Sequence, residues 1–164
     1  MKGGRTSLLA GRNTAPLSDN DIRRVGNTFY GLDREAVFAH ADGENTRCRV
    51  IEVEGEIVCE IRFGADIFPG KSVVDPNSAL SMRAAAAHEL SHLHRWRDKT
   101  ELDGDHLVEI DEALTDLEAI LRYYPQLNEN EIRQLIADAI QRLQIFAQRH
   151  PEGFATLKPA PNEV

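Results

Sequence analysis

The residues best suited to chemistry lie in the segment His88-Glu89-Leu90-Ser91-His92. If this segment is helical, its two histidines are separated by about 40° around the axis and about 6 Å along it, so both imidazoles can reach one metal ion. Glu89 then lies beside the histidine pair, where its carboxylate can reach a metal-bound water without becoming a ligand. The pattern predicts a hydrolytic metal site with Glu89 as its general base.

The third ligand must come from another part of the chain. Catalytic zinc usually has three protein ligands and keeps its fourth position for water, and two histidines with a glutamate form one such set. Glu112 lies twenty residues beyond His92, a gap that fits a helix, a turn and a returning helix. Asp116 falls one turn beyond Glu112 on the same face. There it can accept a hydrogen bond from the second nitrogen of His88, which fixes the tautomer and orientation of the ring.

Together these residues resemble the zincin metallopeptidases, and within them the gluzincin branch typified by thermolysin, whose pattern is HExxH, a 19-residue gap and ExxxD. The resemblance implies a zinc-dependent endopeptidase with the ligands His88, His92 and Glu112, the base Glu89 and the orienting acid Asp116. Arg83, five residues before the first histidine, adds a looser likeness to the small intracellular metallopeptidases of the ImmA/IrrE type. The two likenesses cover residues 83–116, about a fifth of the chain.

Thermolysin-like enzymes also use a histidine and a tyrosine to stabilise the developing oxyanion. These residues come from parts of a much larger protein that have no counterpart here. By position alone, the local candidates for this role are His94, Arg95, His106, Tyr123 and Tyr124. We favour His106, because it lies in the predicted turn that leads to the third ligand.

The stretch from Gly64 to Gly70 leaves the last predicted strand and approaches the metal helix. In zincins the strand nearest that helix lines the cleft and binds an extended peptide. The resemblance therefore implies that the substrate backbone adds as a strand to four residues, Ala65, Asp66, Ile67 and Phe68. The alternative is that this stretch is a hydrophobic connector.

Composition limits the classes of protein to consider. A chain of 164 residues with 41% hydrophobic residues fits one compact domain. Its formal charge of −8 disfavours nonspecific attraction to nucleic acid or to anionic membranes. No apolar run approaches the roughly 18 residues of a spanning helix, and Ser7-Leu8-Leu9-Ala10 is shorter than a secretory signal core of roughly 7–15 residues. We expect a cytoplasmic protein whose partners are a protein or peptide substrate and a regulatory protein, without nucleic acid or membrane.

The two cysteines lie on neighbouring predicted strands. If the strands pair about a turn at residues 54–55, Cys48 faces Ile61 and Cys59 faces Val50. The two thiols are then diagonal to each other, and buried free thiols are favoured over a disulfide.

The remaining pattern predicts a small α+β domain of zincin type, in which an antiparallel three-stranded sheet packs on the active-site helix and on the helices that follow. We expect a flexible tail at 1–17, a single metallopeptidase-like domain at 18–150 and an irregular tail at 151–164. Strands are predicted at 36–40, 47–53 and 56–63. Helices are predicted at 18–30, 75–97, 107–124 and 128–149 from their caps and apolar spacing.

The expected chemistry is metal-assisted hydrolysis. Zn²⁺ polarises the scissile carbonyl and lowers the pKa of its bound water toward roughly 7, and Glu89 takes the proton and later passes it to the leaving amine. Two alternatives stay open: a regulatory or binding protein that keeps zinc without proteolysis, and a zinc hydrolase that acts on non-peptide bonds.

Overall fold

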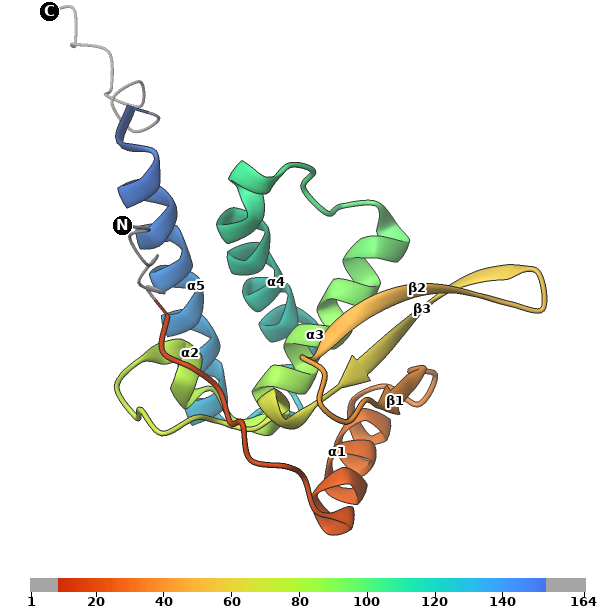
Figure 1. Ribbon diagram of the computed structural model, residues 1–164. Helices are drawn as coiled ribbons and strands as arrows, with labels where there is room; N and C mark the ends of the chain where they lie inside the picture. The colour runs from red at the N-terminus through yellow and green to blue at the C-terminus, as the bar shows by residue number, and fades with distance from the viewer. Residues whose placement is uncertain (1–8, 153–164) are drawn as a thin grey trace, which may run out of the picture.

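The computed structural model describes residues 9–152 of the chain. Helix α1 (Asp19–Leu32) comes first, followed by the strands β1 (Phe38–His40), β2 (Arg47–Val53) and β3 (Glu56–Phe63). The 3-10 turn η1 (Ala65–Ile67) leads to α2 (Pro76–Ala79), α3 (Met82–Asp98), the turn η2 (Asp105–Leu107), α4 (Val108–Tyr123) and α5 (Glu129–Arg149). Helices and one small sheet confirm the predicted α+β class (Figure 1).

The sheet is mixed, with the strand order β1-β3-β2. Strands β2 and β3 form an antiparallel hairpin, and Glu54 and Gly55 at its turn both have positive φ, as a two-residue type I′ turn requires. Strand β1 pairs in parallel with the other edge of β3, so the prediction of a purely antiparallel sheet is wrong for this strand. Residues 41–46 cross from edge strand β1 to edge strand β2 and pass beside Gly64 at the end of β3, where a Cβ would lie 1.8 Å from the carbonyl oxygen of Glu44.

The register of the hairpin is the predicted one. Cys48 lies opposite Ile61 and Cys59 opposite Val50, and both cysteines are free. The side chain of Cys59 is buried, and that of Cys48 is half-buried. The preference for free thiols over a disulfide is therefore confirmed.

Helix α3 lies between the hairpin and α1 on one side and the pair α4 and α5 on the other (Figure 1). Its first half carries the four alanines Ala84–Ala87, all of which are buried. Because these side chains are small, the neighbouring elements approach the backbone of α3 closely, and the helix can occupy the middle of the core. Around it the largest core side chains are Phe29 of α1, Ile61 and Phe63 of β3, Ile67 of η1 and Leu135 of α5.

The predicted helix over residues 75–97 is interrupted at Leu80. Asp75 caps α2 as expected, but Leu80 has φ −54° and ψ 122°, and Ser81 then caps α3 by accepting a hydrogen bond from the amide of Ala84. Serine is a favoured N-cap residue. The break was not predicted because its backbone groups bond to side chains distant in the sequence: Arg12 donates to the carbonyl of Leu80, and Gln134 bonds both the carbonyl of Ala79 and the amide of Ser81.

Residues 9–17 are attached to the domain, unlike the loose tail that the sequence suggested. The guanidinium of Arg12 donates to backbone carbonyls on two sides, those of Asp66 and Ile67 and those of Asn77, Ser78 and Leu80. An uninterrupted helix would use the last three carbonyls internally. The rest of the two predicted tails, residues 1–8 and 153–164, lies outside the described residues.

None of the helices in residues 9–152 combines the length and apolar character needed to cross a membrane.

Candidate metal centre

Three side chains converge between α3 and α4. Nε2 of His88 lies 3.2 Å from one carboxylate oxygen of Glu112, and Nε2 of His92 lies 3.2 Å from the other. One potential ligand atom from each of these residues falls within 4.8 Å of the others. The two histidines come from successive turns of α3 and the glutamate from the returning helix α4, so the structure brings together the three predicted ligands.

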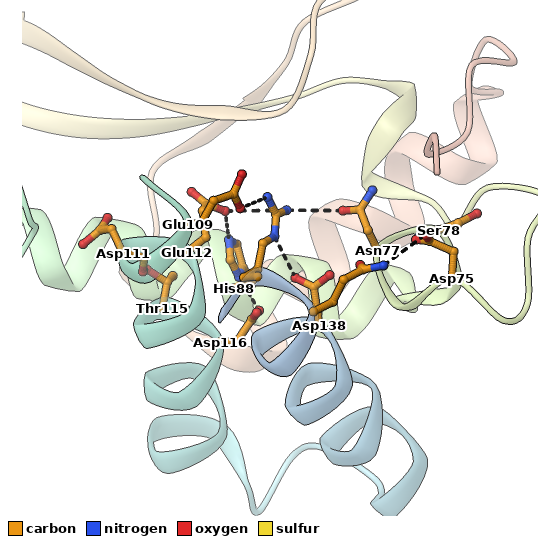
Figure 2. Close-up of polar contacts among 12 residues, drawn as sticks. Asp75, Asn77, Ser78, His88, Glu109, Asp111, Glu112, Thr115, Asp116 and Asp138 are labelled. Atoms are coloured by element: carbon orange, nitrogen blue, oxygen red, sulfur yellow. Dashed lines mark hydrogen bonds and ion pairs between the residues drawn. The ribbon is translucent and has the colours of Figure 1, made fainter. Parts of the chain in front are cut away.

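Asp116 orients the first of these ligands. Its Oδ1 lies 2.6 Å from Nδ1 of His88, and its side chain is fully buried (Figure 2). This contact leaves Nε2 of His88 as the nitrogen that faces Glu112. Burial, together with the neighbouring carboxyl of Asp138, raises the pKa of Asp116 to about 7, although the imidazole of His88 acts in the opposite direction.

The electrostatics of the site favour a cation among these side chains. Burial would lower the pKa of His88, but the carboxylates of Asp116 and Glu112 outweigh it and raise that pKa well above its usual value. For Glu112, burial favours the neutral acid, yet contacts with His88 and His92 hold its pKa well below the usual range. Without a metal ion, a proton on His88 supplies the positive charge that these carboxylates favour. A divalent cation can supply that charge instead.

The donor set suits zinc. Two imidazole nitrogens and one carboxylate oxygen form a known zinc ligand set that leaves a fourth position open. The buried carboxylate behind His88 supplies the hydrogen bond that metal-bound histidines usually make through their other nitrogen. The residues therefore fit a zinc ion on chemical grounds.

Two cavities adjoin the three side chains. The first, of about 150 Å³, is lined by His88 and the second, of about 350 Å³, by His92. Glu89 and Glu112 line both, so a molecule bound in either cavity lies next to Glu89. Burial raises the pKa of Glu89, while the nearby His92 and His88 lower it, and the balance is upward.

The five residues considered for the oxyanion lie elsewhere. His106 is exposed in η2, and Tyr124 is exposed at the end of α4. His94 contacts the hydroxyl of Tyr123 at 2.9 Å, and Arg95 is paired with Asp111. Within residues 9–152, none of the five lines either cavity beside the ligands, so the geometry does not support the preference for His106.

Arg95 has a structural role. Its buried guanidinium contacts the side chain of Asp111 and donates to the carbonyl of Thr100 at 2.9 Å. Asp111 also accepts a hydrogen bond from the amide of Leu102. These contacts join the end of α3 to the start of α4, one residue before Glu112, and they set how the ligand-bearing helix returns. Arg83, which carried the looser likeness, contacts the carbonyl of Gln126 and lies outside both cavities.

The predicted substrate strand at residues 65–68 is a 3-10 turn and the residue that follows it. Asp66 and Ile67 do line the first cavity. The backbone carbonyls of all four residues, however, accept hydrogen bonds from Arg12 or Asn13. In this structure the chain itself occupies the acceptors that an added substrate strand would need.

Sequence reasoning missed Arg142 of α5, which lines the first cavity together with Asp138, Asn77 and Thr46. Asp138 and Arg142 lie four residues apart on the face of α5 that also carries buried Leu135 and Ala139. Charged residues on an otherwise apolar face were the signal available in the sequence.

Comparison of the chain with protein-family models, with curated proteins and with solved structures found no match. The resemblance to the zincins therefore depends on residues 83–116 alone.

Proposed function

We propose that this protein is a zinc-dependent peptidase of the zincin type, which hydrolyses peptide bonds in a protein or peptide substrate. The observation that carries the proposal is the convergence of His88, His92 and Glu112 on one point, with Glu89 adjacent to the first ligand on the same helix. When bound at that point, zinc supplies Lewis-acid polarisation of a carbonyl and a lowered pKa for water.

Glu89 is the proton carrier in this proposal. Glu89 lines both cavities, and its carboxylate accepts a proton from the attacking water and later donates it to the leaving amine. A pKa raised by burial suits both steps, because a general base and acid works best when its pKa approaches the working pH. Asp116 acts through His88 by holding the ring so that Nε2 faces the ligand cluster.

The decisive experiment combines metal analysis of purified protein with cleavage of a quenched-fluorescence peptide library. The Glu89→Gln variant should retain zinc and the fold, and it should lose hydrolysis by at least about 100-fold. Glu129→Gln, an exposed change of the same kind on α5, should leave hydrolysis unchanged. Protein that binds no zinc, or a Glu89→Gln variant that still cleaves peptides, would refute the proposal.

A second measurement separates the alternatives in the cell. Mass spectrometry of protein termini should reveal cleavage products with the wild-type protein that are missing with Glu89→Gln. If the variant instead supports the cellular function fully, the protein is a zinc-containing binding or regulatory protein. Turnover of small amides or esters without cleaved protein termini would indicate a non-peptide hydrolase.

A further inference from the structure

We propose that Arg142 of α5 is a catalytic residue of this hydrolysis, whose guanidinium donates hydrogen bonds to the scissile carbonyl oxygen as that oxygen gains negative charge. The inference depends on the proposed function and adds to it the oxyanion-stabilising residue that the sequence did not provide.

The position of Arg142 carries the first step of the argument. Its Nη2 lies 4.0 Å from Oε2 of Glu112, the same oxygen that lies 3.2 Å from Nε2 of His88. Arg142 also lines the 150 Å³ cavity together with His88, Glu89 and Glu112. A carbonyl group bound in this cavity beside His88 and Glu112 therefore lies in the space that the guanidinium lines.

The second step is that the guanidinium is held in place and still has free donors. It donates to Glu109 at 3.2 Å, to Asn77 at 3.4 Å and to Asp138 at 3.4 Å, and Figure 2 shows these three partners grouped beside His88 and Glu112. These bonds use three of the five N–H groups of an arginine, one each on Nε, Nη1 and Nη2. Two N–H groups remain, one on each terminal nitrogen. Donors fixed before the reaction stabilise developing charge without the cost of reorganisation.

The other arginine of this cavity does not fit the role. Nε and both terminal nitrogens of Arg12 donate to backbone carbonyls at residues 66–67 and 77–80. These bonds bridge two segments of the fold. By the same count Arg12 keeps one unused N–H, on the nitrogen that donates to Ile67. Arg142 keeps one on each terminal nitrogen, and its Nη2 is the one that lies near Glu112.

The proposed step conserves atoms and charge. The water oxygen forms a bond to the carbonyl carbon, the C=O π pair moves onto the carbonyl oxygen, and the water proton passes to the carboxylate of Glu89. The N–H groups of Arg142 bind this oxygen more strongly than they bind the neutral carbonyl. The pair then returns, the C–N bond breaks, and the amine leaves with the proton from Glu89.

The test uses Arg142→Lys, which keeps the positive charge and removes the planar set of donors. In the zinc-loaded full-length protein, kcat for the library peptide that is cleaved fastest should fall about 10- to 100-fold, with KM changed less than about threefold. In the cobalt-loaded protein, the affinity for inorganic phosphate, measured by visible absorption, should fall about tenfold, because phosphate presents a comparable oxyanion. Zinc affinity should stay unchanged.

Arg149→Lys is the matched control. Arg149 lies on the same helix and contacts the same Glu109 at 3.2 Å, but its side chain is 55% exposed and lines neither cavity. This variant should keep wild-type kcat and phosphate affinity. A comparison of the two variants separates loss of the ion pair with Glu109 from loss of the donors in the cavity.

An unchanged kcat with unchanged phosphate affinity in Arg142→Lys would overturn the proposal. So would a loss of activity explained by weaker zinc binding, because Arg142 would then act through Glu112. Should the variant fail to fold, NMR of the wild-type zinc-loaded protein decides: phosphate should shift the guanidinium signals of Arg142 and leave those of Arg149 in place. If wild-type protein cleaves no peptide, the proposed function fails, while the phosphate measurements still decide whether Arg142 binds an oxyanion.

Discussion

At the scale of single residues, His88 has a carboxylate at each of its two nitrogens. Asp116 contacts Nδ1 and Glu112 faces Nε2, and together they raise the pKa of the ring well above 6.5 although burial lowers it. A histidine whose pKa is raised on folding stabilises the fold at low pH, and this contribution is lost as the pH rises through the raised pKa. The proposed zinc ion would therefore compete with a proton for Nε2 of His88.

This competition predicts how zinc affinity depends on pH. At pH 7, binding should release about one proton from His88, and the affinity should rise about tenfold per pH unit until the pH passes the raised pKa. Titration calorimetry in buffers of different ionisation enthalpy measures the proton count directly. An affinity that is constant between pH 6 and 8 would show that the ring carries no proton to displace.

At the scale of elements, the sequence was most informative where local contacts decide the structure. Ser18 with Asp21 and Asn128 with Glu131 form capping boxes at the starts of α1 and α5, and the predicted hairpin turns at residues 54–55. These features depend on residues within three positions of one another, so their signal survives in the sequence.

Other elements depend on distant contacts and could not be predicted in this way. The break at Leu80 is accompanied by hydrogen bonds from Arg12, 68 residues earlier, and from Gln134 of α5. The parallel pairing of β1 requires residues 41–46 to cross beside Gly64 at the end of β3. The ligand pattern on α3 and α4 could be read because its spacing follows helix geometry. Arg142 could not be placed beside this pattern. Nothing local to α5 indicates which elements are contacted by the face that carries Arg142.

The bridge made by Arg12 gives a prediction at this scale. Arg12→Ala removes the side-chain donors of the carbonyls of Asp66, Ile67, Asn77 and Leu80, and we expect the free energy of unfolding to fall by about 2–4 kcal/mol. Chemical denaturation of the zinc-loaded protein measures this change. Arg23→Ala, an exposed substitution on α1, should alter stability by less than about 0.5 kcal/mol. Equal stability of the two variants would mean that residues 9–17 do not hold the segments together.

At the scale of the whole molecule, the ligand cluster connects elements that are distant in sequence. His88 and His92 belong to α3 and Glu112 to α4, and Arg142 links the glutamate to α5. An ion that binds three side chains of the folded state stabilises that state alone, because the unfolded chain does not hold the three ligands together. The proposed zinc ion would therefore couple metal binding to folding across α3 and α4.

The size of this coupling can be predicted. Free zinc at a hundredfold excess over Kd adds about 2.7 kcal/mol to the stability of the fold, and for a chain of this length each kcal/mol shifts Tm by about 2–4 °C. Removal of zinc with a chelator should therefore lower Tm by about 5–10 °C in calorimetry, and added zinc should restore it. Glu112→Gln lacks one carboxylate ligand, so its Tm should respond much less to zinc at the same concentration. A wild-type Tm that ignores both chelator and zinc would mean that these three side chains hold no ion in the folded protein.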